Sequence, residues 1–471
     1  MGETSHPSSD ARPVNREKLS RTVFVLGVFA VCLVRLVSLV QATAVDVLFD
    51  DQWDALRPLF TNQGPGQTFF SQHGLPFLGL GGVVDWYLFA VTGWDVRAES
   101  WAGVVALVLA TAFALALAVR LRGHLAWSDA AFPLLLLSGL HWETLTFTPF
   151  LGATILPLLF TVLLAYAWSS EARWGRVFWI GLLGALTLFT GYGFCGFPAT
   201  VALALVLWCR PRPVPARDHR WVYGWILAVA GVAALAFVAQ QRWALGEGPF
   251  RFPVANWWDY PRFVALLFTS MLGWRAITVG SVLVGAILLA LVIAAWAGAA
   301  RAIWRRQPSG RARAVWILTG TSLVYATLNA VGRLPTNLEA AFMWRYTTLM
   351  MPALCGLALA AEGWAKSRTP RLRLGLGVAW LALAGMIWGN FTPETYAATV
   401  AQAKRLWVAS YLSSRDLHAA NQASNYWVYF QNPDSPGVAE KLRWLEKRHL
   451  SFFRTTEAEP AKLPTPPPQP R

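Results

Sequence analysis

Long apolar runs alternate with short polar stretches along most of the chain, from residue 22 to residue 388. About 20 apolar residues are needed to cross a bilayer as an upright helix. The pattern therefore predicts about 11 transmembrane helices, an odd number between roughly 9 and 11. The predicted spans are Thr22–Ala44, Ser100–Val119, Ala130–Leu140, Pro149–Trp168, Val177–Gly191, Phe194–Cys209, Trp221–Ala239, Ile277–Ala300, Ala314–Val331, Tyr346–Trp364 and Leu374–Trp388.

Three of these runs are shorter than a bilayer requires, namely Ala130–Leu140, Val177–Gly191 and Phe194–Cys209. They either extend into flanking residues or form broken helices that neighbouring helices bury. We therefore predict an all-α polytopic membrane protein, with a transmembrane domain over residues 22–390.

Two longer polar regions lie between or after the spans. The first, residues 45–99, contains the apolar but glycine-interrupted stretch "LPFLGLGGVVDWYLFAVTGW", which indicates a helix lying in the membrane interface. The second, residues 391–455, predicts a helix from Pro393 to about Arg415 and a short helix with Val438, Leu442 and Leu445 on one face. The proline-rich tail, residues 456–471, is predicted to be disordered.

Charged residues are sparse and follow the spans. Only 14% of the 471 residues are charged, where a soluble protein carries roughly a quarter. The net charge is +15, and the basic residues concentrate in residues 1–21 and in every second loop after them. This distribution predicts a cytoplasmic N-terminus and a periplasmic C-terminus. The basic excess is then a topology signal, and no nucleic-acid partner is needed to explain it.

Common cofactor motifs are missing from the sequence. It contains no GxxxxGK[ST], HExxH or CxxC motif, and "GLGG" at residues 79–82 lacks the third glycine of a dinucleotide fingerprint. We therefore predict no cofactor and no dedicated metal site. Whether a divalent cation joins Asp50 and Asp51 stays open.

Three carboxylates follow the first span, in "FDDQWD". Asp50 and Asp51 lie close to the headgroup plane, where a carboxylate can act as a general base on an acceptor hydroxyl. Asp54 lies further from the span and is expected to meet water. In an extended segment, the side chains of Asp50 and Asp51 would face opposite ways, and we expect Asp51 to point into the cavity. The alternative is a solvated acidic loop without a catalytic role.

Basic residues at the outer ends of late spans are the second group of candidates. Arg333 and Arg345, the latter followed by Tyr346, can bind a lipid phosphate through bidentate hydrogen bonds. The alternative for Arg345 is an interfacial anchor. Arg35, in the middle of the first span, is expected to form an ion pair or a carbonyl contact within the bundle.

Two histidines complete the candidates. His73 lies in "FFSQHGLPF" of the first loop, and His141 lies beside Glu143 in "GLHWET". Either could bind substrate, although a lone histidine more often makes a structural polar contact.

Together, "FDDQWD", "SQHGLPFLGLGGVVDWYLF" and "GRLPTNLEAAFMWRYTTL" resemble the motifs of a group of bacterial integral membrane proteins of uncharacterised function. That group carries a DDW-like start, a QHxEHR-like stretch and a late GR…A…RY motif. The overall layout also resembles the type C glycosyltransferases (GT-C). The chain departs from the group in reading DDQW for DDW and "GLPF" after Gln72-His73. The matching positions are Asp50, Asp51, His73, Arg333, Arg345 and Tyr346.

The resemblance implies a GT-C-like enzyme of the bacterial inner membrane. It would transfer a sugar from a polyprenyl-phosphate donor, with inversion, to a periplasmic or lipid acceptor. Asp51 or Asp50 would be catalytic, and Arg345, Tyr346, Arg333 and His73 would bind substrate. Two alternatives stay open: a non-enzymatic lipid or solute transporter, and an inactive scaffold in envelope polysaccharide assembly. The sequence leaves the sugar, the acceptor and the oligomeric state open.

Overall fold

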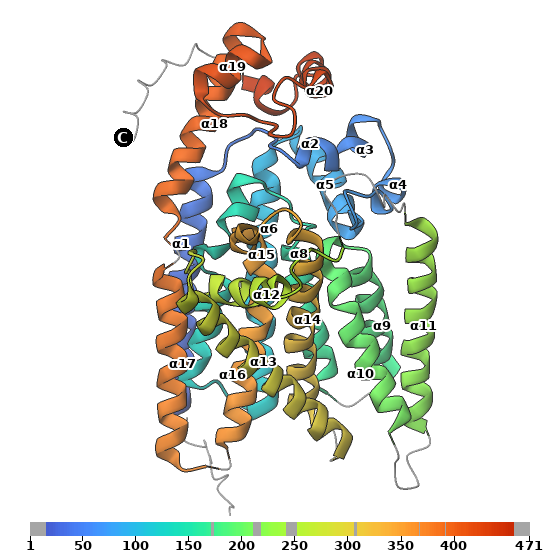
Figure 1. Ribbon diagram of the computed structural model, residues 1–471, viewed down its shortest axis with the longest axis vertical. Coiled ribbons are helices and arrows are strands. Elements are labelled where there is room, and N and C mark those ends of the chain that lie inside the picture. Colours follow the sequence, from blue (N-terminus) through green and yellow to red (C-terminus); the bar gives the residue numbers. More distant parts are fainter. Residues whose placement is uncertain are drawn as a thin grey trace, which may run out of the picture.

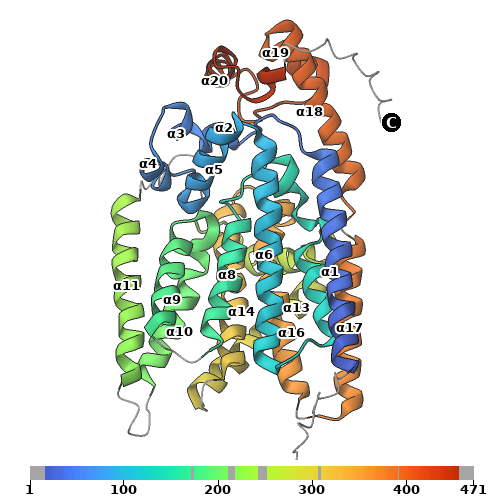
Figure 2. The same cartoon turned by 180° about the vertical axis from the view of Figure 1, so that it is seen from behind.

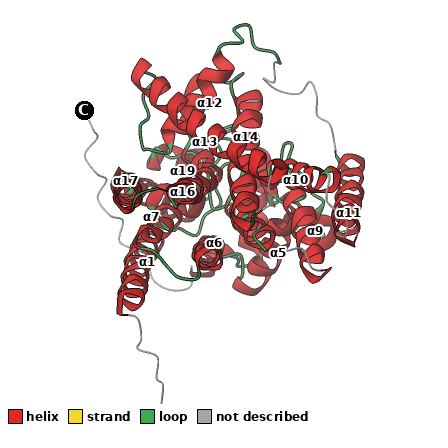
Figure 3. Cartoon of the chain, turned by 90° about the horizontal axis from the view of Figure 1, so that it is seen from below, coloured by secondary structure: helices red, strands yellow, loops and turns green. Residues whose placement is uncertain are grey.

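The structure is a computed structural model that describes residues 16–170, 174–210, 218–241, 252–305, 309–366, 368–390 and 392–455. It is 79% helical, and the described residues contain no strand beyond an isolated antiparallel bridge between Gln72 and Phe77. Figure 3, which views the molecule from below, shows helices and connecting loops alone. The all-α prediction is therefore confirmed. The predicted disordered tail, residues 456–471, lies outside the described residues.

Eight helical segments among the described residues are long and apolar enough to cross a membrane, so the chain is a multi-pass membrane protein. They run side by side along the long axis of the molecule (Figures 1 and 2). They are α1 (Arg16–Thr43), α6 (Val96–Arg122), η4 with α10 (Gly191–Cys195, Phe197–Cys209), α11 (Asp218–Gln240), α13 (Val279–Arg305), α14 (Gly310–Arg333), α15 with η6 and α16 (Trp344–Thr347, Thr348–Met350, Met351–Ala365), and α17 (Pro370–Asn390), which α18 follows.

The shorter apolar runs form shorter helices. The helices α8 (Ile155–Trp168) and α9 (Trp174–Leu188) are apolar but have only 14 and 15 residues. The run predicted at Ala130–Leu140 is broken and buried, as one of the alternatives allowed. It contains the end of η1 (Trp127–Ala130), the helix α7 (Ala131–Leu136) and the start of η2 (Gly139–His141). The six residues of α7 span only about 9 Å, too little to cross a bilayer.

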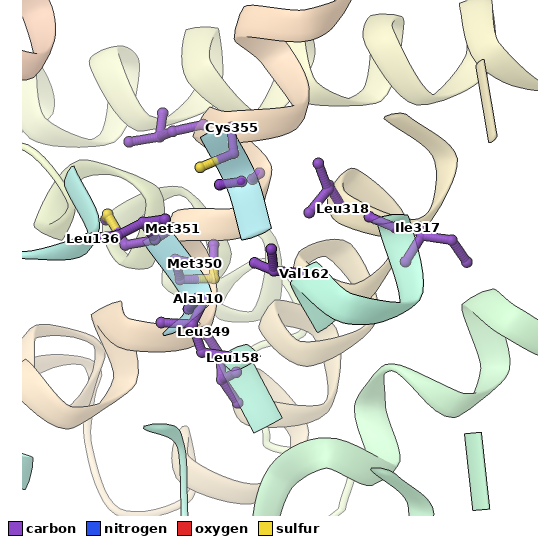
Figure 4. Close-up of a cluster of buried hydrophobic side chains, with 14 of the residues drawn as sticks. Ala110, Leu136, Leu158, Val162, Ile317, Leu318, Leu349, Met350, Met351 and Cys355 are labelled. Carbon is purple, nitrogen blue, oxygen red and sulfur yellow. The ribbon is translucent and has the colours of Figure 1, made fainter. Parts of the chain in front are cut away.

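The core of the bundle surrounds α14, which packs against α8, α10, α13 and α16. Every residue from 312 to 322 of α14 is buried. Side chains from α6, α8, α14 and α16 interdigitate there, including Ala110, Leu158, Leu318 and Cys355 (Figure 4). Gly356 lets α16 approach α14 closely, because a Cβ at this position would lie 2.7 Å from the Thr319 side chain.

A cap covers one end of the bundle (Figure 1) and consists of residues 45–95 and 392–455. Its helices are α2 (Gln52–Ala55), α3 (Arg57–Phe60), α4 (Pro65–Phe69), α5 (Gly79–Thr92), α18 (Glu394–Ser414), α19 (Leu417–Ser424), α20 (Pro436–Lys447) and η7 (Ser451–Thr455). The two parts of the cap share one hydrophobic core, in which Trp53 and Phe60 meet Trp407, Leu442 and Phe452. The cap is therefore assembled from two segments with 296 residues between them in the sequence.

The two predicted C-terminal helices are confirmed as α18 and α20. Val438, Leu442 and Leu445 are buried on one face of α20, as expected. The helix α19 between α18 and α20 was not predicted. One further helix, α12 (Asp259–Ser270), was not predicted and lies crosswise to its neighbours (Figure 1), with η5 (Leu338–Phe342) beside it.

Arg35 makes the contacts that its position in the first span predicted. Its Nη2 atom lies 2.7 Å from a carboxylate oxygen of Glu394, and Nη1 donates a hydrogen bond to the carbonyl of Trp388 at 3.1 Å. The guanidinium also stacks over the ring of Trp388. Arg35 therefore joins α1 to α17 and α18, which is a structural role.

Candidate active site

A cavity of about 820 Å³ lies where the cap meets the bundle. Its walls come from the loop after α1, the loop before α5, the segment between η2 and α8, η4, the end of α14 and the start of α15. Five of the six predicted site residues line it, namely Asp50, Asp51, His73, Arg333 and Arg345. The folded chain therefore brings residues of all three sequence motifs to one place.

Both Asp50 and Asp51 line this cavity, contrary to the expectation that they face opposite ways. The segment is not extended there. Asp50 has a φ of 46°, in the left-handed region, and Asp51 has the helical φ of −51° that begins α2. The backbone N–H of Asp50 donates to the carbonyl of Val428 at 2.7 Å. The cap thus helps to hold a turn that directs two adjacent carboxylates into one cavity.

Asp51 is surrounded by polar groups. Its Oδ1 atom lies 3.6 Å from Nε2 of His73 and 3.4 Å from the amide nitrogen of Gln431, and its Oδ2 lies 3.5 Å from Nη1 of Arg345. Burial raises the pKa of Asp51, but His73 and the charges of Arg345 and Arg333 outweigh burial and hold the pKa below its ordinary value. Asp51 is therefore a stable anion that orients its neighbours.

Asp50 has a different environment. Its Oδ1 atom is buried and has no hydrogen-bond partner in the part of the chain that the structure describes. Burial and the charge of neighbouring Asp51 raise the pKa of Asp50 above its ordinary value. A carboxylate with an unoccupied oxygen and a raised pKa accepts a proton more readily than a carboxylate held in ion pairs.

Arg345 lies between two carboxylates. Besides Asp51, its Nε lies 3.8 Å from Oε1 of Glu143, and its backbone N–H donates to Oε2 of Glu143 at 3.0 Å. Glu143 begins the π-helical turn η3 (Glu143–Phe147), and such turns recur at functional sites. Sequence analysis placed Glu143 only as a neighbour of His141, and its pairing with Arg345 was missed.

Arg333 lies at the C-terminal end of α14. Its Nη2 atom donates a hydrogen bond to the hydroxyl of Tyr192 at 3.1 Å, and its guanidinium lies 5.6 Å from the ring of Tyr346. The guanidinium of Arg345 lies at the same distance from this ring. Tyr346 is fully buried and is not part of the cavity wall, so it supports the two arginines from behind.

His73 reaches the cavity through a tight loop. The bridge between Gln72 and Phe77 closes the loop, and the backbone N–H of His73 donates to the carbonyl of Pro76 at 3.1 Å. Gly74 supplies the positive φ of 64° that this turn requires. The loop therefore presents His73 to Asp51 on one side and Leu75 to the rim of the cavity on the other.

Much of the cavity wall is apolar. Its side chains include Leu75, Phe77, Phe194, Leu328 and Val331. Leu75 and Leu328 are 48% and 41% exposed, so the apolar lining continues to the molecular surface beside the spans. The cavity thus combines a charged end at Asp50, Asp51 and Arg345 with an apolar side, as an amphiphilic ligand requires.

Two other candidates lie outside the cavity wall. His141 is fully buried, and its Nδ1 lies 3.1 Å from the hydroxyl of Thr348, so its contact is structural. Asp54 accepts a hydrogen bond from the hydroxyl of Tyr429 at 2.8 Å and lies 3.8 Å from Nζ of Lys441. Asp54 therefore links α2 to the C-terminal part of the cap, in addition to meeting water.

A metal site is not evident from the side chains. Within the described ranges, no group of three or more His, Cys, Asp or Glu residues is arranged to hold a metal ion. No protein-family model matches the sequence, and no curated protein matches it significantly. Function therefore has to be inferred from the geometry of the cavity.

Proposed function

We propose that the protein is a GT-C-type glycosyltransferase that transfers a sugar from a polyprenyl-phosphate donor to a hydroxyl of a periplasmic or lipid acceptor. The observation that carries the proposal is one cavity that holds a carboxylate pair, two arginines and an apolar wall. The apolar wall suits the prenyl chain, the arginines suit the phosphate, and the carboxylates suit the acceptor hydroxyl.

In the proposed reaction, the acceptor oxygen attacks the anomeric carbon of the donor sugar. The bond from that carbon to the phosphate oxygen breaks, and the prenyl phosphate leaves with the electron pair. The acceptor proton passes to a carboxylate, for which Asp50 is the better candidate because it lines the cavity and because burial and the charge of Asp51 raise its pKa. Asp51 then serves to hold Arg345 and His73.

The leaving phosphate is a weak base, so it needs cationic stabilisation rather than a proton. Arg345 and Arg333 supply two positive charges in the cavity wall. One carboxylate and a cation therefore suffice, in contrast to the two catalytic carboxyl groups of glycoside hydrolases. The proposed outcome is inversion at the anomeric carbon.

The proposed location is the bacterial inner membrane, with the N-terminus in the cytoplasm and the cap in the periplasm. The alternation of basic residues supports this orientation. The proposal includes a GT-C-like arrangement with an odd number of crossings, between about 9 and 11, which requires an odd number of the shorter apolar segments to cross together with the eight longer ones.

The test is glycan or glycolipid transfer in membranes from a strain that lacks the native copy, with protein levels matched. Asp50→Asn keeps the size of the side chain but removes its basicity, so transfer should fall by about 10²–10⁴-fold. Asp51→Asn should cause a smaller loss. The matched control is Asp54→Asn, which changes a carboxylate of the same motif outside the cavity. Full activity in both Asp50→Asn and Asp51→Asn would overturn the proposal and favour a transporter or an inactive scaffold.

A further inference from the structure

Both carboxylate oxygens of Glu143 contact Arg345. One oxygen accepts the backbone N–H of Arg345 at 3.0 Å, and the other lies 3.8 Å from the side-chain Nε. The Glu143 side chain is only 11% exposed and lines the cavity. Glu143 therefore constrains both the backbone and one edge of the guanidinium of Arg345.

The turn that carries Glu143 is itself held from two sides. His141, two residues earlier, contacts Thr348 next to α15 at 3.1 Å. The buried Lys404 of α18 donates to the carbonyl of Thr146 at 3.1 Å and also to that of Phe147. Because the turn is hydrogen-bonded to the bundle through His141 and to the cap through Lys404, Glu143 has little freedom to move away from Arg345.

The guanidinium of Arg345 still has unused hydrogen-bonding capacity. Its contacts include Asp51 at 3.5 Å, Glu143 at 3.8 Å and the sulfur of Met343 at 3.7 Å, together with an interaction with the side chain of Tyr346. Close charge-assisted hydrogen bonds have lengths of about 2.7–2.9 Å. Nη1 thus lies near the carboxylate of Asp51 without forming a close hydrogen bond to it. A phosphate can therefore replace Asp51 with little loss of interaction energy.

We infer that Glu143 is a positioning residue, which holds the backbone and the Nε edge of Arg345 so that the two Nη groups are presented to the phosphate of a lipid-linked substrate. This inference rests on the proposed function, because it requires a prenyl phosphate in the cavity. Asp51 releases Arg345 when the phosphate binds, whereas Glu143 keeps its hold through the backbone N–H.

The experiment measures equilibrium binding of two probes to the purified full-length protein in lipid nanodiscs. Farnesyl phosphate carries a prenyl chain and a phosphate, and farnesol carries the chain alone. The preference for the phosphate over the alcohol isolates the contribution of the phosphate site. A loss of general packing would weaken both probes together and leave this preference unchanged.

Three variants are compared with the wild type. Glu143→Ala removes both contacts with Arg345 and should reduce the preference by about tenfold or more, as expected for losing a hydrogen-bonded charged partner. Glu143→Gln retains an oxygen that can accept the Arg345 N–H. Its preference for the phosphate should therefore lie between the preferences of the wild type and Glu143→Ala. Glu394→Gln is the matched control, because it alters a Glu–Arg pair with Arg35, away from the cavity, and should leave the preference unchanged.

The outcomes separate the two hypotheses. A wild type that binds both probes equally would overturn the proposed function and this inference with it. A wild type that prefers the phosphate, with unchanged preferences in Glu143→Ala and Glu143→Gln, would overturn the role of Glu143 alone. A loss in Glu394→Gln as large as in Glu143→Ala would also overturn it, because any Glu–Arg pair would then have the same effect.

Discussion

The guanidinium of Arg345 lies 3.5 Å from the carboxylate of Asp51, although 294 positions separate the two residues in the sequence. The distance is short enough for an electrostatic interaction between two side chains that are each only 24% exposed. It is longer than a close ion pair, so each side chain can exchange its partner for a substrate group.

Arg345→Lys should reduce transfer by about 10-fold to 100-fold. Lysine keeps the positive charge but cannot make the bidentate contact with a phosphate that a guanidinium makes. The measurement is the same membrane transfer assay, with protein levels matched. Arg415→Lys is a suitable control, because Arg415 pairs with Glu446 in the cap and does not line the cavity. Equal activity in Arg345→Lys and Arg415→Lys would argue against phosphate binding by Arg345.

The acid limb of the pH–rate profile should move to lower pH in the residual activity of Asp51→Asn. Burial and the charge of Asp51 raise the pKa of Asp50, while Arg345 lowers it. Removing the charge of Asp51 lowers the pKa of Asp50, so the base stays ionised at lower pH. The measurement is transfer against pH for wild type and variant. An acid limb that does not move would show that Asp50 is not the titrating base.

Trp53→Ala should destabilise the cap strongly. Trp53 is fully buried and packs with Phe60 between the two parts of the cap. Truncating a buried tryptophan to alanine typically costs about 3–5 kcal/mol. Thermal unfolding of the purified protein should show a lower midpoint. Trp427→Ala is the control, because Trp427 is 47% exposed and should change the midpoint little. Similar midpoints for both variants would contradict the shared core.

The proposed orientation predicts which side of the membrane each end of the bundle faces. A reporter that is active only outside the cytoplasm should be active when fused after Ala397, which lies in α18. The same reporter should be inactive after Gly310, at the opposite end of α14 from the cavity. Activity at Gly310 would reverse the orientation and remove the carboxylates from the periplasmic side.

The long helices were predictable because a run of apolar residues is a local property. The irregular ones were not. The helix α12 contains Pro261 and Arg262 early in a 12-residue segment and therefore lacks the signature of a span. The run at Ala130–Leu140 is apolar because it is buried among other helices, and apolarity alone does not distinguish burial by protein from burial by lipid.

The candidate site was predictable where short motifs marked it, at Asp50, Asp51, His73, Arg333 and Arg345. Their convergence is a tertiary property. Gln431 contacts Asp51 from 380 positions away, and nothing in its local sequence indicates this contact. The role of the glycines in "GLGG" was likewise not predictable from the sequence. Gly79 has a φ of 56°, and a Cβ on Gly81 would lie 2.3 Å from the backbone of Gly152, so these glycines permit close packing.

The contacts between the C-terminal part of the cap and the first loop have a consequence for biosynthesis. Asp50 and Asp51 are among the first 60 residues to be translated, but Val428 and Gln431, which contact them, are made after all eight candidate spans of the described residues. Helices can insert as they emerge, whereas this turn has to wait for its distant partners. A ribosome that stops before residue 426 therefore releases a chain with its bundle in the membrane but without these contacts to the two aspartates. Truncated products of this kind would be inserted but would lack the contacts that hold the two aspartates at the cavity.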